Sequence, residues 1–338
     1  MEEMKPFLAK VADGNALNQT EAWQAFDIIM SGKATPSQIG AFLMALRLRG
    51  ETVDEITGAV SQMRTKMSTV DVPADAVDIV GTGGTGTKTY NISTCAAIIM
   101  AGGGISVAKH GNKALSSLSG SGDVLSSLGV NLEQDSQGVT RCIKEANIGF
   151  MFAPNHHSSM RFVGPSRVEM GIRTIFNLLG PLANPANVKH HLIGVFDPQW
   201  LEPFAQTLKN LESKMAWIIH GEGGLDEIST LGETQIVQLK DGEITRFTIS
   251  PEDVGLPRAK MEDIRGGTGD ANAVALRAIL SGEKGPYRDI VVMNAAAGLL
   301  IGGKVDSYAD GVELAQQIID NGGALNALNK LVAVSNQN

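Results

Sequence analysis

The stretch DIVGTGGTGTKTYNIST, residues 78–94, decides the fold class of this chain. A short β-branched run leads into glycines that satisfy the pattern G-x-G-x-x-G at Gly81, Gly83 and Gly86. A lysine, Lys88, stands two residues beyond the last of them. Three interpretations compete for such a loop: a dinucleotide-binding turn, a P-loop, or a phosphate site of another kind.

The surrounding residues argue against the first two interpretations. A dinucleotide turn needs a helix that begins inside the motif, but GTGTKTYN is poor helix-forming sequence. It also needs an acidic residue at the end of the next strand, where this chain has Lys109 and His110. In a P-loop the lysine follows a glycine, whereas Lys88 follows Thr87. A phosphate site of another kind remains.

The composition is that of a globular protein. The chain has 338 residues, of which 43% are hydrophobic and 19% charged, a length that suggests two domains. We expect no signal peptide and no membrane span. Cys95 and Cys142 lack metal-site spacing and indicate reduced thiols in the cytoplasm. The net charge of −8 argues against nucleic acid as a partner, so any phosphate site must be a local concentration of donors.

Residues 1–72 have the pattern of a helical domain. Capping boxes pair Asn18 with Glu21, Thr35 with Gln38, and Thr52 with Glu55. Apolar residues recur with helical spacing behind each box; these are Trp23, Phe26 and Met30, then Ile39, Phe42, Leu43 and Leu46, then Ile56, Val60, Met63 and Met67. We expect these stripes to be buried, helices around 156–180 to join this domain, and its sides to serve a subunit interface.

Residues 73–338 have the pattern of an α/β domain with a mostly parallel central sheet. Short apolar runs alternate there with glycine-rich loops and helical patterns. The runs predict strands at 77–80, 105–108, 148–152, 192–196, 216–219 and 290–293. Ligands of such sheets bind beyond the carboxyl ends of the strands, so the loops that follow each strand are the candidates for function.

Two of these loops are rich in glycine, hydroxyl groups and basic residues. The first ends in NIST, where Asn91 or Ser93 is expected to cap a helix through 95–100, and a helix start binds anions. The second is KHGNKALSS, 109–117, with Lys109, Asn112, Lys113, Ser116 and Ser117. Two such loops after adjacent strands predict a substrate that carries several phosphates.

A polyphosphate substrate usually arrives with Mg²⁺, which prefers oxygen ligands from one or two carboxylates. Asp226 and Glu227, here called the acidic pair, are adjacent in the loop after the strand AWIIH. Acidic residues are also common at helix starts, where they need no metal. The phosphate loops expected at the same sheet edge favour a metal site.

Together these motifs resemble the anthranilate phosphoribosyltransferase family. The resemblance is carried by GTGG with NIST, KHGN with SGSGDVLSSLGV, FAPNHHSSMRFVGPSRVEMGIRTIFNLLGPLANP, and GLDEIS, in this order over nearly the whole chain. It implies a fold like that of nucleoside phosphorylases and class III phosphoribosyltransferases. It also implies transfer of the phosphoribosyl group of 5-phosphoribosyl 1-diphosphate to the amine of anthranilate, in tryptophan biosynthesis, by a Mg²⁺-dependent cytoplasmic homodimer.

The resemblance also implies roles for individual residues, none of them a nucleophile or general base. For the phosphoribosyl diphosphate it implies Gly81, Gly84, Thr85, Thr89, Asn91, Ser93, Thr94, Lys109, His110, Gly111, Asn112, Lys113, Ala114, Leu115, Ser116, Ser117 and Ser121. For anthranilate it implies Gly81, His110, Asn112, His157 and Arg167. For the metal it implies Ser93, Asp226 and Glu227.

Three positions depart from the family pattern. Thr85 stands where the family has an aspartate, Leu118 where it commonly has a lysine, and Lys113 where it usually has an arginine. The first two changes remove charges near the expected diphosphate, and the third loses a bidentate fork. We therefore expect a functional site that uses the phosphoribosyl donor less well.

Three alternatives stay open at this point. A pyrimidine nucleoside phosphorylase shares the architecture, but its K-x-S phosphate signature is absent. A weakly active or inactive paralogue that binds nucleic acid is the second, and the net charge and the acidic pair argue against it. A dinucleotide-dependent oxidoreductase is the third and fits the glycine loop least well.

Overall fold

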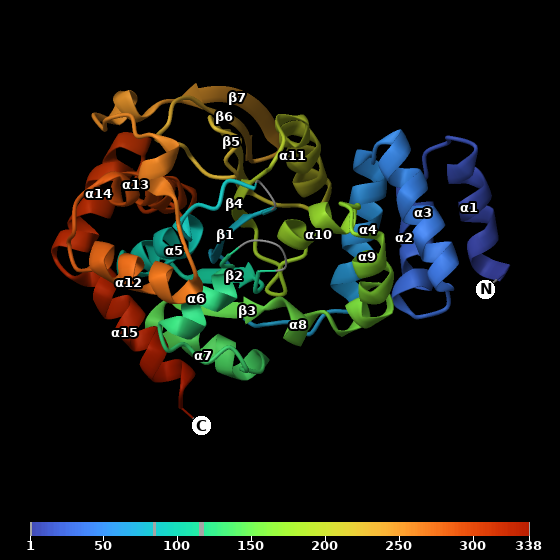
Figure 1. The fold of residues 1–338 in the computed structure, drawn as a ribbon, viewed down its shortest axis with the longest axis horizontal. Coiled ribbons are helices and arrows are strands. Elements are labelled where there is room, and N and C mark those ends of the chain that lie inside the picture. The colour runs from blue at the N-terminus through green and yellow to red at the C-terminus, as the bar shows by residue number, and fades with distance from the viewer. Residues whose placement is uncertain (1, 84–85, 115–117, 338) are drawn as a thin grey trace.

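The computed structural model describes residues 2–83, 86–114 and 118–337 (Figure 1). The N-terminal helices are α1 Lys5–Ala12, α2 Gln19–Met30, α3 Pro36–Arg49 and α4 Val53–Thr65. The strands are β1 Val77–Gly81, β2 Val107–Gly111, β3 Ile148–Phe152, β4 His190–Gly194, β5 Met215–Gly221, β6 Thr234–Lys240 and β7 Glu243–Ile249. The later helices are α5 Ile92–Gly102, α6 Ser121–Ser127, α7 Ser136–Ala146, α8 Ala153–His156, α9 Gly164–Met170, α10 Phe176–Leu182, α11 Leu201–Asn210, α12 Gly269–Leu280, α13 Pro286–Ile301, α14 Tyr308–Asp320 and α15 Gly323–Ser335. Short 3₁₀ helices are η1 Glu2–Met4, η2 Ser158–Phe162, η3 Pro198–Trp200, η4 Pro251–Val254 and η5 Met261–Ile264.

The three predicted capping boxes are present at the starts of α2, α3 and α4. The box of α4 is the most buried, because Glu55 has none of its surface exposed. Its carboxylate accepts the backbone N–H groups of Leu17 and Thr52, each at 2.9 Å, and pairs with Arg49. The predicted apolar stripes are buried except at Trp23, which is 37% exposed.

The seven-stranded sheet has the order β3-β2-β1-β4-β5-β6-β7. The first five strands in this order, β3, β2, β1, β4 and β5, pair in parallel, and β6 and β7 add an antiparallel edge. The chain winds from β1 outward to β3 and then returns to place β4 on the other side of β1. The strand order therefore reverses between β1 and β4, and ligands of open α/β sheets bind at such a point.

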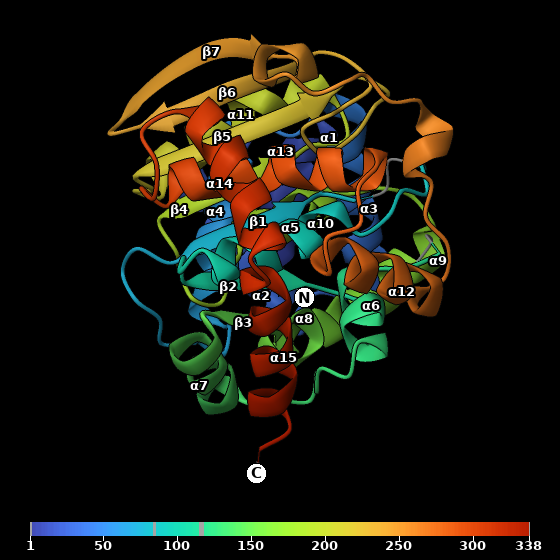
Figure 2. The ribbon, with the colours of Figure 1, turned by 90° about the vertical axis from the view of Figure 1, so that its left-hand side faces the viewer.

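Helices cover both faces of the sheet (Figures 1 and 2). On one face, Ile79, Leu192 and Trp217 pack into a core with residues of α5, α13 and α15. On the other face, Ile193 and Ile218 share a core with α11 and the N-terminal helices. Alternate residues of each strand thus serve opposite cores, as the two-residue period of a strand requires. Among the described residues no helix is long and apolar enough to cross a membrane.

Two predictions about the sheet are wrong. The run at 290–293 lies inside α13, whose buried side chains surround the helix, and a short apolar run cannot be assigned by periodicity alone. Strands β6 and β7 are absent from the predicted set. Asp241 and Gly242, with φ of 49° and 84°, form the turn between these strands, and a D-G pair between alternating runs is the signal that was overlooked.

We predict that Glu55→Ala destabilises the protein by about 3–5 kcal/mol, because Arg49 and two backbone donors lose a buried partner. Glu21→Ala is the matched control, since Glu21 occupies the same place in the box of α2 but its side chain is 29% exposed. That change should cost about 0.5–1 kcal/mol. Urea unfolding measures both, and equal costs would show that burial does not distinguish the two boxes.

Candidate active site

The loop after β5 carries the acidic pair across the carboxyl edge of the sheet. Gly221, the last residue of β5, and Leu225 exchange backbone hydrogen bonds of 2.8 and 3.1 Å. The turn between them passes through Gly223 and Gly224, both with positive φ, which glycine adopts without strain. This tight return places Asp226 next to the ends of β1 and β4.

Asp226 lies over the point where the strand order reverses. Its carboxylate accepts the backbone N–H of Gly83 at 2.8 Å. Gly81 and Gly194, paired at the ends of β1 and β4, leave room for it. A Cβ on Gly81 would overlap the carboxylate of Asp226, and one on Gly194 would overlap its backbone carbonyl. A side chain at position 194 would therefore displace the loop, and one at position 81 would displace the Asp226 carboxylate.

Glu227 caps the helix that follows the first phosphate loop. Helix α5 begins with Asn91 as its N-cap residue, but the Asn91 side chain makes no capping bond. Its oxygen instead accepts from Ser119 and Asn272. The Glu227 carboxylate accepts the backbone N–H of Ser93 at 3.2 Å. Asn91 therefore occupies the predicted N-cap position, but an acid from another loop accepts the capping hydrogen bond.

Lys109 does not lie in a loop, which corrects the expectation for 109–117. Strand β2 extends to Gly111, and Lys109 is 2% exposed within it. Its ammonium donates to the backbone carbonyl of Ile79 at 2.6 Å and to the Ser93 hydroxyl at 3.4 Å. Lys109 is therefore a buried residue of the site, close to the acidic pair.

The positive charge of Lys109 does not balance the negative charges of the acids around it. Burial raises the pKa of Glu227 to about 8, with a further contribution from Asp226, whose own pKa burial also raises. Burial likewise raises the pKa of Asp78 to about 6. Burial lowers the pKa of Lys109, and the three nearby acids oppose that shift. With all four groups ionised, one ammonium faces three carboxylates, so a divalent cation would complete the neutralisation.

The residues at the acidic pair suit Mg²⁺. The described part of the chain has no cluster of three or more His, Cys, Asp or Glu side chains placed to hold a metal. Mg²⁺ does not need one, because it usually takes one or two carboxylates and completes its shell with water and substrate phosphate oxygens. Asp226, Glu227 and the hydroxyl of Ser93 are all oxygen donors, so this donor set fits.

A cavity of about 540 Å³ opens beside the acidic pair, between the helical domain and the sheet. Met63, Phe176 and Pro181 supply apolar wall. Its lining also includes all the residues predicted for anthranilate, namely Gly81, His110, Asn112, His157 and Arg167.

Two histidines of this cavity are neutral at pH 7. The rings of His110 and His157 lie 5.1 Å apart, and both residues are buried. Burial lowers the pKa of His157 to about 4, and burial together with His157 lowers that of His110 well below its usual value. Charging either ring would cost desolvation and repulsion, so the pair gives the cavity polar but uncharged walls.

Two arginines line the cavity, the exposed Arg161 and the half-buried Arg167. Arg167 is the better candidate to bind a substrate inside the cavity. It projects from α9, with its guanidinium carbon 5.4 Å from the centre of the Phe176 ring. Burial alone lowers the pKa of Arg167, and no acid of the described residues forms an ion pair with it. A planar guanidinium in an apolar cavity is suited to bind a carboxylate through two hydrogen bonds.

The remaining residues predicted to bind the phosphoribosyl diphosphate lie mostly around the same sheet edge. Asn112, Lys113 and Ala114 follow β2, and Asp123 holds this segment by accepting the N–H of Ala114. The segment also meets the start of α6, because Ser121 donates to the Asn112 carbonyl. Thr89 is half-buried, whereas Thr94 is 1% exposed and offers no open surface. Outside the described residues lie Gly84, Thr85, Leu115, Ser116 and Ser117.

A buried pair of polar side chains that is not among the predicted site residues fixes β1 and β2. Asp78 accepts the Asn184 amide at 2.7 Å and the backbone N–H of His110 at 3.2 Å. The Asn184 amide also donates to the carbonyl of Ala108. An acid inside a β-branched run is the signal that could have identified Asp78.

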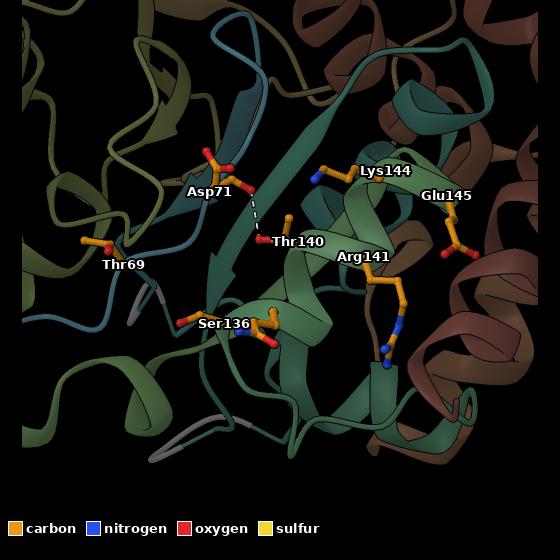
Figure 3. Close-up of a pocket in the computed structure, with 8 residues that line it drawn as sticks. Thr69, Asp71, Ser136, Thr140, Arg141, Lys144 and Glu145 are labelled. Atoms are coloured by element: carbon orange, nitrogen blue, oxygen red, sulfur yellow. Dashed lines mark hydrogen bonds between the residues drawn. The ribbon is translucent and has the colours of Figure 1, made fainter. Parts of the chain in front are cut away.

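A second hollow, of about 490 Å³, lies away from the site, between α7 and the segment before β1 (Figure 3). The hydroxyl of Thr140 donates there to the backbone carbonyl of Asp71, and Arg141 and Lys144 stand beside it. It contains none of the predicted site residues.

Comparisons with known proteins agree with this geometry. The helical bundle domain of a glycosyl transferase family matches residues 5–67, and the a/b domain of that family matches 73–325. The anthranilate phosphoribosyltransferase of Rhizobium rhizogenes is 61% identical over 336 residues, 99% of each chain.

Solved structures show the same likeness. The anthranilate phosphoribosyltransferase of Thermus thermophilus superposes with a TM-score of 0.93 at 42% identity, over 98% of this chain and 99% of that one. The enzyme of Saccharomyces cerevisiae in complex with PRPP and Mg gives 0.90 at 28% identity, over 98% and 97%. These relatives support neither the nucleoside phosphorylase nor the nucleic-acid-binding alternative. The chain belongs to the anthranilate phosphoribosyltransferase family.

Proposed function

We propose that this protein joins anthranilate to the phosphoribosyl group of 5-phosphoribosyl 1-diphosphate. The products are N-(5-phosphoribosyl)anthranilate and pyrophosphate, in a step of tryptophan biosynthesis. One observation carries the proposal: Gly81 both lines the cavity that contains Arg167 and touches Asp226. A carboxylate-binding cavity and a site for a metal-bound diphosphate therefore meet at one residue.

Anthranilate binds in the cavity with its carboxylate toward Arg167. Phe176 and Met63 pack against the aromatic ring, and the neutral His110 and His157 add no competing charge. The amine is ortho to the carboxylate, so holding the carboxylate at Arg167 also fixes the position of the amine. For the reaction, the ring edge that carries the amine must face Gly81 and the ribose.

The reaction breaks the bond between C1 of the ribose and the diphosphate oxygen. The lone pair of the amine forms the new bond to C1, and the electron pair of the C1–O bond leaves with pyrophosphate. The proton that the amine loses passes to the departing pyrophosphate or to water. The substrate brings its own activated bond, so the protein needs mainly to position the reactants and stabilise charge. We propose that the start of α5 and Lys113 supply positive potential to the leaving group.

We propose Asp226, Glu227 and Ser93 as the residues that hold Mg²⁺. When bound, the cation neutralises charge on the diphosphate. Leu118, 54% exposed, adds no charge beside it, and Thr85 lies outside the described residues. This is why we expect the donor to be used less well than a lysine and an aspartate at these positions would allow.

We further propose a cytoplasmic homodimer with domains at 1–72 and 73–338, the region 156–180 joining the first. Phe176 packs at 5.6 Å against Phe26 of α2, which supports that assignment. Cys95 and Cys142 are buried free thiols, which suits a reducing compartment. Helix α3 exposes Met44 and Leu48, four residues apart on one face, which a second copy would cover.

The reaction itself is tested by the loss of anthranilate fluorescence. Consumption should require both 5-phosphoribosyl 1-diphosphate and Mg²⁺. Phosphorolysis of thymidine or uridine, with no consumption of anthranilate, would overturn the proposal.

We predict that Arg167→Ala raises KM for anthranilate about tenfold to a hundredfold, because a charge-assisted hydrogen bond of about 1.5–3 kcal/mol is lost. KM for the donor should change little. Arg167→Lys keeps the charge without the planar guanidinium. Its KM for anthranilate should lie between those of the unmodified protein and Arg167→Ala. Equal losses for both substrates would instead assign Arg167 a general structural role.

We predict that Asp226→Asn combined with Glu227→Gln nearly abolishes turnover at any Mg²⁺ concentration. The folded protein should remain as stable, because replacing partly desolvated acids with neutral isosteres removes a cost of burial. Steady-state kinetics and thermal unfolding measure the two effects. Unchanged turnover that still requires metal would place the cation elsewhere.

We predict that Met44→Glu combined with Leu48→Glu converts the dimer into monomers, because two buried carboxylates would oppose the interface. Val274→Glu, at an exposed apolar residue of α12, is the matched control and should leave the dimer intact. Sedimentation velocity distinguishes the species. A double variant that stays dimeric would exclude this face of α3 as the interface.

A further inference from the structure

A fully buried asparagine lies directly behind the acidic pair. Asn294, in the middle of α13, has none of its surface exposed. Its side-chain oxygen accepts the backbone N–H of Ile228 at 2.9 Å. Its amide nitrogen donates to the carbonyls of Ile228 and Ile290, at 2.9 and 2.8 Å. Asn294 therefore binds both backbone groups of the residue after Glu227, as a neighbouring strand would.

The sheet holds the same segment from the opposite side. A Cβ on Gly194 would overlap the backbone carbonyl of Asp226, and one on Gly221 would overlap the backbone carbonyl of Glu227. Backbone atoms cannot swing aside as the end of a flexible side chain can. Residues 226–228 are thus fixed between two strand ends and α13.

We propose that Asn294 is a positioning residue for the acidic pair. By binding Ile228, Asn294 fixes the position of residues 226–228 along the chain direction. Gly194 fixes the distance of this segment from the sheet. Together they make both carboxylates face the site of the phosphoribosyl diphosphate. An apolar side chain at 294 would leave two backbone groups of Ile228 unpaired in the core, where Ile228 has no exposed surface. This inference rests on the proposed role of Asp226 and Glu227 as cation ligands.

Groups that orient metal ligands from behind typically affect metal affinity by 10–100-fold. We therefore expect Asn294→Ala and Gly194→Ala each to weaken Mn²⁺ binding about 10- to 100-fold. Mn²⁺ accepts the same oxygen ligands as Mg²⁺, and paramagnetic resonance of the free ion reports binding directly. The titration contains 5-phosphoribosyl 1-diphosphate but no anthranilate, so it does not depend on turnover. A protein-free titration at the same diphosphate concentration gives the Mn²⁺ that the diphosphate itself chelates, and this amount is subtracted. In kinetics, KM for the donor should rise while KM for anthranilate stays unchanged.

Two control variants perturb the core without touching this segment. Arg288→Met, also in α13, removes hydrogen bonds to the carbonyl of Gly282 and to Asp320 from a residue that is 5% exposed. In β3, a Cβ at Gly149, as in Gly149→Ala, would lie 2.7 Å from the side chain of Ile143. Both controls should lower the thermal unfolding temperature and leave Mn²⁺ affinity unchanged.

The inference is overturned if Asn294→Ala and Gly194→Ala lose thermal stability as the controls do but bind Mn²⁺ like the unmodified protein. Asn294→Ser, which keeps a hydroxyl at the site, provides a milder change if Asn294→Ala does not fold. The variant with Asp226→Asn and Glu227→Gln distinguishes a failure of the cation assignment from a failure of the role of Asn294. If it also binds Mn²⁺ normally, the cation assignment fails; if it alone loses Mn²⁺, only the role of Asn294 fails.

Discussion

The close approach of Asp226 to the ends of β1 and β4, by its carboxylate at β1 and by its backbone at β4, is the constraint on which the site depends. It requires glycine at both 81 and 194, the paired residues that end those strands. It also requires the sharp return after β5 through two glycines of positive φ. These features bring one carboxylate to the loop after β1 and the other to the start of α5. The point where the strand order reverses thereby becomes a site with concentrated negative charge.

The desolvation of these neighbouring carboxylates explains which charged groups suit the site. Neighbouring acids with raised pKa values are poorly compensated by one buried lysine, so the site favours a cation or protons. The adjoining cavity has the opposite character, with a half-buried arginine and neutral histidines. In the proposed function, a carboxylate would be attracted to Arg167 and repelled by the acidic pair, whereas a metal-bound diphosphate would be held at the pair. The charge distribution would thus separate the two substrates and leave Gly81 where they meet.

Much of this could be predicted from sequence, because the signals are local. Capping boxes identify α2, α3 and α4, and glycine with hydroxyl groups after a β-branched run identifies the loop after β1. Arg167 and His157 follow only from the family resemblance, since nothing local distinguishes them from surface or packed residues. Lys109 and Asn294 could not be assigned correctly, because their roles depend on burial and on partners far away in the chain. The apolar run at 290–293 was misassigned for the related reason that a central helix is buried all round.

The most direct test of this account is a crystal structure with Mn²⁺ and 5-phosphoribosyl 1-diphosphate, in which anomalous scattering locates the cation. The account predicts a peak at the carboxylates of Asp226 and Glu227, with the pairing of Ile228 to Asn294 unchanged. A peak only at other side chains, with the acidic pair still bonded to the backbone of Gly83 and Ser93, would contradict it.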